Sequence, residues 1–261
     1  MGIRIANTLF ALASAVALPL LVQAQGGGRG GPPATAKAAA PIDLTGYWVS
    51  IVNEDWRFRM VTPSPGDYQG VPMTAEARKV ADAWDPAKDE AAGDQCKSYG
   101  APALLRAPEH LHITWQDDRT LRLDTDAGTQ TRLFHFGDWK APAGPPTLQG
   151  DSLASWETRG AGRGGPPPDP NAPPQGKGSL RVATTHLKAG YLRKNGVPYS
   201  ENAVLTEYWD MIKERNNDLM LVVTIVTTDP QFLREPFIIT SHFKKQAGDD
   251  GWKPTPCSAK W

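Results

Sequence analysis

The feature that most constrains this chain is a succession of short segments in which apolar and polar residues alternate, running from residue 110 to residue 245. A period of two is typical of β-strands, whose successive side chains point to opposite faces of a sheet. Turn residues separate the segments, and Asn195-Gly196 is the strongest hairpin signal among them. Extended segments are also expected at 43–52 and 56–62. The later strands are expected at 110–115, 119–125, 129–136, 152–158, 180–187, 202–212, 219–228 and 237–245.

Helical signals are sparse. Thr74 can cap one short helix that runs to about Trp84, and Asp85-Pro86 would end it. Residues 86–108 are expected to be loop. Because no helices alternate with the strands, a doubly wound α/β sheet is excluded. The chain is therefore expected to be mainly β, an antiparallel barrel of about eight to ten strands with one short helix.

The N-terminus resembles an export signal. Arg4 supplies one positive charge, an apolar run covers about residues 9–22, and Val22-Gln23-Ala24 matches a cleavage site. A membrane anchor needs about 20 unbroken apolar residues, and this run is shorter. We therefore expect a cleaved signal peptide at 1–24, no stable membrane span afterwards, and a periplasmic or secreted protein.

Two Gly/Pro-rich stretches share the hexapeptide GRGGPP, at 28–33 and 162–167. Such composition buries too little apolar surface to order itself. Residues 25–41 are therefore expected to be a disordered leader, and about 160–178 a flexible insertion. The remainder, 42–261, is expected to form a single barrel domain.

The charge balance bears on whether the protein binds nucleic acid, and the cysteine count bears on whether it contains a disulfide. The chain has 28 basic and 28 acidic residues, so nucleic acid is not an expected partner. The only two cysteines are Cys96 and Cys257. In an oxidising compartment they are expected to form one disulfide, with free thiols as the alternative.

Gly46-Tyr47-Trp48, at the start of the first expected strand, resembles the G-x-W signature of lipocalins. That resemblance implies an eight-stranded barrel in which the tryptophan closes one end and a late basic residue, Lys244 or Lys245, stacks on it. The long segment 53–108 and the lack of a second lipocalin motif depart from the family.

A second resemblance covers nearly the whole mature chain. Segments 125–136, 190–204, 235–245 and 252–257 look like those of an uncharacterised family of secreted bacterial proteins. This similarity implies one exported domain and no particular activity.

The histidines suggest a possible metal site. His110 and His112 share one face of their strand, opposite Leu111 and Ile113, and His135 lies on a strand nearby. A His-x-His pair with a third histidine is a common zinc site. The alternatives are that the pair faces solvent or that it lines a pocket without metal. No cofactor is expected, a transition metal such as zinc being the alternative.

Two charged residues stand out on otherwise apolar strand faces. Arg132 alternates with Phe134, and Glu207 alternates with Leu205 and Trp209. If these faces point inward, Glu207 is either a general acid or base with a raised pKa or the ion-pair partner of an arginine, Arg132 or Arg193. The residues expected to carry catalysis are Glu207, His186 and Tyr208. Those expected to bind a ligand are Trp48, Arg132, Phe134, Trp209 and His135.

Nucleophile-elbow, phosphate-loop, zinc-protease and haem-attachment motifs are missing. The expected function is binding of a small, largely apolar ligand in a barrel cavity outside the cytoplasm. The alternatives are a periplasmic enzyme of isomerase, dehydratase or hydrolase type that acts on such a ligand, and an envelope structural or interaction protein.

Overall fold

The structure is a computed structural model that describes residues 34–158 and 178–259, with the side chain of Thr158 excepted. The predicted signal peptide, the first part of the predicted leader and nearly all of the predicted insertion lie outside the described residues.

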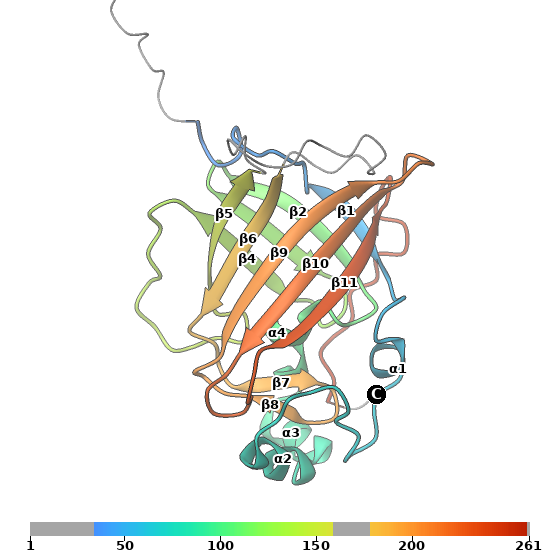
Figure 1. The fold of residues 1–261 in the computed structure, drawn as a ribbon, viewed down its shortest axis with the longest axis vertical. Coiled ribbons are helices and arrows are strands. Elements are labelled where there is room, and N and C mark those ends of the chain that lie inside the picture. Colours follow the sequence, from blue (N-terminus) through green and yellow to red (C-terminus); the bar gives the residue numbers. More distant parts are fainter. Residues whose placement is uncertain (1–33, 159–177, 260–261) are drawn as a thin grey trace, which may run out of the picture. The chain divides into compact units, whose positions relative to one another are not determined.

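Nine strands form a closed barrel in the order β1-β11-β10-β9-β6-β5-β4-β3-β2 (Figure 1). Strands β7 and β8 form a separate two-stranded sheet. The mainly β barrel predicted from the sequence is confirmed. It is not wholly antiparallel, because β4 and β5 pair in parallel. The bounds are β1 Gly46–Ile51, β2 His110–Asp117, β3 Thr120–Thr125, β4 Thr131–Phe136, β5 Asp151–Thr158, β6 Gly178–Thr185, β7 Gly190–Arg193, β8 Val197–Tyr199, β9 Val204–Lys213, β10 Leu219–Thr228 and β11 Phe237–Lys245.

The alternation in the sequence decides which side chains fill the barrel. On β9, Leu205, Glu207 and Trp209 are buried, whereas the intervening Thr206 and Tyr208 are partly exposed. A one-residue slip would exchange these two sets, so burial of one face specifies the register. The charged Glu207 therefore lies inside the barrel together with apolar neighbours.

Strand β1 closes the barrel by pairing with both β11 and β2. Trp48 on β1 is fully buried, and its indole N–H donates to the carbonyl of Leu44 at 2.9 Å. The Lys245 ammonium lies 4.6 Å from the centroid of the Trp48 ring, and it also donates to the carbonyl of Thr45. A cation at this distance over an indole is attracted by the ring quadrupole. The predicted stacking of a late lysine on Trp48 is confirmed for Lys245.

The described part of the leader is ordered, contrary to the prediction for 25–41. Residues 34–41 cross one end of the barrel (Figure 1), where the carbonyl of Ala36 accepts a 2.7 Å hydrogen bond from the Trp156 indole. The Lys37 N–H donates to the carbonyl of Asp118 at 3.1 Å. These two bonds attach the leader to the barrel and offset part of the entropy cost of ordering it.

Within residues 34–109, four α-helices and one 3-10 helix precede β2, where only one helix was predicted. The predicted helix is α2, and the Thr74 hydroxyl caps it by accepting from the Ala77 N–H at 3.1 Å. Residues 56–62, predicted to be extended, contain α1, and the predicted loop 86–108 contains the other helices. The bounds are α1 Trp56–Arg59, α2 Ala75–Asp82, α3 Pro86–Ala92, the 3-10 helix Lys97–Tyr99, and α4 Ala101–Leu104.

Asp85-Pro86, predicted only to end a helix, also begins one. The Asp85 carboxylate accepts from the Ala87 N–H at 2.9 Å, and Pro86 occupies the first turn of α3. Proline is favoured there because its missing N–H would have no partner in a helix anyway. The remaining helices have four residues each or form a single 3-10 turn, too short to show a helical period in the sequence.

The β7–β8 hairpin lies with α2 and α3 at the barrel end opposite the leader (Figure 1). Its turn uses Gly196 at φ +82°, as the Asn195-Gly196 signal predicted. The predicted Cys96–Cys257 disulfide is present and ties the C-terminal segment to this end. Among residues 34–158 and 178–259, no helix is long and apolar enough to span a membrane.

Candidate functional site

Four of the five predicted ligand-binding side chains point into the barrel. Trp48, Arg132, Phe134 and Trp209 are all buried to within 1% of full burial. The Phe134 and Trp209 rings meet edge to face at 5.5 Å, and the Arg132 guanidinium lies 4.9 Å from the Phe134 centroid. These side chains pack on one another, so a ligand at this level of the barrel would have to displace them.

Arg132 forms a two-pronged ion pair with Glu207. Its two terminal nitrogens donate to the two carboxylate oxygens at 2.8 Å and 2.6 Å, and both side chains are inaccessible to solvent. Arg132 also donates to the hydroxyl of Thr184 at 3.3 Å, which in turn bonds Ser152 at 2.8 Å. This geometry agrees with the interpretation of Glu207 as the ion-pair partner of Arg132.

The predicted catalytic residues do not converge. His186 follows β6 and contacts the Asp151 carboxylate at 2.8 Å on the exposed side of the sheet. Tyr208 lies on the outer face of β9, opposite in direction to Glu207. Three groups that face different sides of a sheet cannot act on one substrate atom.

The three histidines proposed for a metal are also separated. His110 contacts Asp126 at 2.7 Å, His112 stacks on Tyr47 at 4.1 Å, and His135 stacks on Trp139 at 3.9 Å. The register sets His112 opposite Asp124 and His135 opposite Thr120, about 13 Å apart along β3. Within the described residues, no group of three or more His, Cys, Asp or Glu side chains could hold a metal ion.

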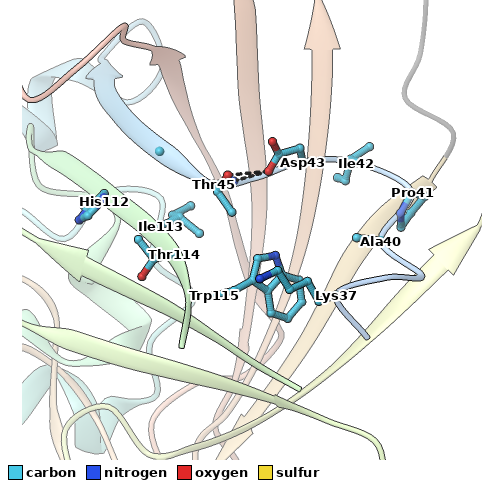
Figure 2. Close-up of a pocket in the computed structure, with 11 residues that line it drawn as sticks. Lys37, Ala40, Pro41, Ile42, Asp43, Thr45, His112, Ile113, Thr114 and Trp115 are labelled. Carbon is cyan, nitrogen blue, oxygen red and sulfur yellow. Dashed lines mark hydrogen bonds between the residues drawn. The ribbon is translucent and has the colours of Figure 1, made fainter. Parts of the chain in front are cut away.

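One cleft, of about 700 Å³, lies between the leader and the paired strands β1 and β2 (Figure 2). Figure 2 shows its side chains spread around a wide opening, with His112 and Lys37 on different sides. The Asp43 carboxylate is used within the segment itself, since it accepts from the N–H and the hydroxyl of Thr45 at 3.0 Å and 2.7 Å. The cleft therefore offers volume without converging polar groups.

A second cleft, of about 550 Å³, opens beside α1 at the other end of the barrel, and we refer to it as the α1 cleft. It combines an apolar rim with two cations. Met60 and Val61 are 57% and 66% exposed, and the neighbouring Trp56 is 62% exposed. Apolar side chains this exposed and this clustered are typical of a binding surface. The residues lining the cleft are Phe58, Arg59, Met60, Val61, Thr62, Pro108 and Lys194.

Buried arginines hold α1 in place beneath this rim. Arg59 donates to the carbonyl of Arg106 at 2.8 Å and pairs with Glu54. Arg106 in turn pairs with Asp55 at 2.6 Å, just before α1 begins. Burial lowers the pKa of Arg59, a cost that the Glu54 carboxylate opposes. The wall of the cleft is therefore fixed by ion pairs, and its apolar side chains are left exposed.

Arg193 completes the support from the hairpin. Its guanidinium lies 4.1 Å from the centroid of Phe58 and donates to the carbonyl of Gln69 at 2.7 Å. Burial, with the nearby charge of Arg106, lowers the pKa of Arg193 to about 10.

Lys194 lines the α1 cleft, and the charge of the buried Glu109, next to the lining residue Pro108, acts on it. Burial lowers the pKa of Lys194 to about 7, although the Glu109 carboxylate opposes the shift. Burial also raises the pKa of Glu109 well above its usual range, and the charge of Asp126 adds to this. In the described part of the chain, neither Glu109 carboxylate oxygen has a hydrogen-bond partner. A cleft-lining group with a strongly shifted pKa, coupled to a buried charge partner, is typical of a functional site.

Neither Lys194 nor Glu109 was predicted from the sequence as a site residue. Lys194 directly precedes the Asn195-Gly196 turn, so its place on a hairpin was predictable, but its burial was not. Glu109 lies between the segment 86–108, which was predicted to be loop, and the first residue of β2. Nothing local in the sequence indicates that the charges of these two side chains interact.

Scans against protein-family models and searches of curated proteins and of solved structures found no match to this chain. The site is therefore interpreted from its own geometry.

Proposed function

We propose that this protein binds a small ligand outside the cytoplasm, and that the ligand has an apolar body and a polar head. The ligand occupies the α1 cleft, with its body against Met60 and Val61 and its head toward Arg59 and Lys194. The observation that carries the proposal is that one cleft combines an exposed apolar rim with the basic side chains of Arg59 and Lys194.

The size and chemistry of the cleft support such a ligand. Small-molecule sites occupy about 300–1,000 Å³ and are mostly apolar with a few placed polar groups. Covering the exposed rim contributes about 25 cal/mol for each Å² of apolar surface removed from water. A head group that accepts hydrogen bonds, such as a carbonyl or carboxylate, complements the Lys194 amine.

The extracytoplasmic setting rests on the predicted signal peptide and on the disulfide. Disulfides persist in oxidising compartments and are rare in the cytosol.

Fluorescence titration with 1-anilinonaphthalene-8-sulfonate, an amphipathic anion, tests the proposal, with decanoate as competitor. We expect saturable binding at one site and competitive displacement. Met60→Ser and Val61→Ser should each weaken binding, by about three- to tenfold if roughly 1 kcal/mol of burial is lost. Val80→Ser is the matched control, since Val80 is 40% exposed on α2. Equal effects at Val61 and Val80, or binding that does not saturate, would refute the location.

An enzyme that acts on such a ligand is the second candidate. The observation that favours it is the proximity of Lys194 and Glu109, whose pKa values are shifted in opposite directions toward neutrality. These two residues replace Glu207, His186 and Tyr208 as the candidate acid and base. Any turnover should then be lost in Glu109→Gln and retained in His186→Gln.

A further inference from the structure

Lys194 is placed so that its amine can act as a nucleophile. It lies in the β7–β8 turn, lines the α1 cleft, and its ammonium nitrogen is 4.9 Å from the centroid of the Tyr99 ring. Burial lowers its pKa to about 7, so far more of its amine is neutral at neutral pH than in an exposed lysine. An ordinary lysine is neutral in only about one molecule in several thousand at that pH.

Glu109 is a buried carboxyl that lies close enough for its charge to act on this amine. It is only 2% exposed, and the charges of the two groups affect one another's pKa. Arg59 on α1 and Asp126 in the β3–β4 turn also face Glu109, the first lowering its pKa and the second raising it. Burial raises the pKa of Tyr99, so its phenol stays protonated. A buried carboxyl with a raised pKa can hold a proton near neutral pH and give it up to a developing base.

We infer that Lys194 forms a reversible imine with the carbonyl carbon of an aldehyde or ketone held in the α1 cleft, with Glu109 as the proton carrier. This inference rests on the proposed function and narrows the polar head of the ligand to a carbonyl group.

The step balances without an oxidant or reductant. The Lys194 lone pair forms a C–N bond to the carbonyl carbon while the C=O π-bond breaks, and a proton moves from nitrogen to oxygen. Glu109 then protonates the resulting hydroxyl, which leaves as water as the C=N bond forms. The imine nitrogen returns its remaining proton to the Glu109 carboxylate. The net reaction joins one amine and one carbonyl and releases one water.

Reductive trapping tests the inference directly. The full mature protein is incubated with benzaldehyde and sodium cyanoborohydride at pH 7, and the benzylated lysines are identified by peptide mass spectrometry. Lys194 should be modified at least about tenfold faster than the exposed Lys140, because far more of its amine is neutral. In the unaltered protein, the labelling rate of Lys194 should rise with a midpoint near pH 7 and then level off, a readout that needs no variant.

Three variants separate the roles. Lys194→Arg keeps the charge and should give no adduct in the cleft, whereas Lys140→Arg should leave labelling of Lys194 unchanged. Glu109→Gln should slow labelling by about 100-fold, the usual contribution of a positioned acid or base.

The outcomes are distinguishable. Labelling of Lys194 no faster than that of Lys140, or without a midpoint near pH 7, would overturn the imine. Saturable binding of the sulfonate probe, displaced by benzaldehyde but with no Lys194 adduct, would overturn the imine and keep the binding proposal. If the sulfonate probe fails to bind while Lys194 is labelled selectively, the imine stands and the amphipathic-ligand proposal fails.

Discussion

Replacing Glu207 with glutamine tests whether the barrel interior is dry. The carboxylate accepts two hydrogen bonds from Arg132, and both side chains are fully buried. Glutamine has nearly the same shape but no charge, so it would leave the Arg132 guanidinium charged in the core. Only the Thr184 hydroxyl, at 3.3 Å, would remain as a second partner.

Breaking a buried ion pair by removing one partner costs about 3–5 kcal/mol, because an uncompensated charge stays in a low dielectric. In a domain of this size, each kcal/mol lowers the melting temperature by about 2–4 °C, so a fall of about 6–20 °C is expected. Replacing both partners by apolar residues, as in Arg132→Met/Glu207→Leu, should be close to neutral or stabilising. The charge, and not the packing volume, would then account for the loss.

Urea unfolding followed by tryptophan fluorescence measures these free energies. The matched control is Glu157→Gln, the same chemical change on an exposed position of β5, which should change stability by less than about 0.5 kcal/mol. If Glu207→Gln costs no more than this control, the pair is hydrated and the reasoning is wrong. That result would favour a barrel interior open to water and to a ligand.

Three further perturbations have expected outcomes. Gly196→Ala should destabilise the protein by about 2 kcal/mol or more in urea unfolding. The new Cβ would lie 2.3 Å from the Trp84 ring, and alanine is strained at φ +82°. An unchanged unfolding midpoint would contradict this packing. The double variant Cys96→Ser/Cys257→Ser should lower the free energy of unfolding by about 3–5 kcal/mol. A reductant should lower the free energy of unfolding of the unaltered protein by the same amount. The raised pKa of Glu109 means that the folded state binds more protons than the unfolded state above about pH 4.5. Its contribution to stability therefore falls as pH rises toward the folded pKa, and Glu109→Gln should flatten that part of the stability–pH profile, whereas identical profiles would refute the shift.

The strands were predictable because alternation is a local property. The alternation predicted on β9 and β2 appears in the structure, and the direction of each face, which the sequence left open, puts Glu207 inside and His110 and His112 outside. The helices α1, α3 and α4 were missed for the opposite reason. Each is seven residues or shorter, and its stability comes from tertiary contacts, with the Asp85 cap added in α3, more than from a repeating apolar stripe.

The candidate site was less predictable than the fold. Arg132 and Glu207 were each expected on a strand face with apolar residues, but the direction of those faces and the pairing of the two charges stayed open until the strand order put β4 and β9 in one barrel with two strands between them. Lys194 and Glu109 carry no motif, and their pKa shifts arise only when burial removes water from both.

From its own residues, the chain indicates that it is a β protein, which side chains share a strand face, and that its only two cysteines are candidates for one disulfide. These follow from alternation, turn chemistry and cysteine count, which are properties of short segments or of composition. Tertiary structure decided which strand faces point inward, that the two buried charges on β4 and β9 form an ion pair, and that a lysine in a hairpin turn lies within electrostatic reach of a carboxyl from another part of the chain. The physical reason is that such meetings depend on strand order and barrel closure, which are set by the sum of many distant contacts and by no single segment.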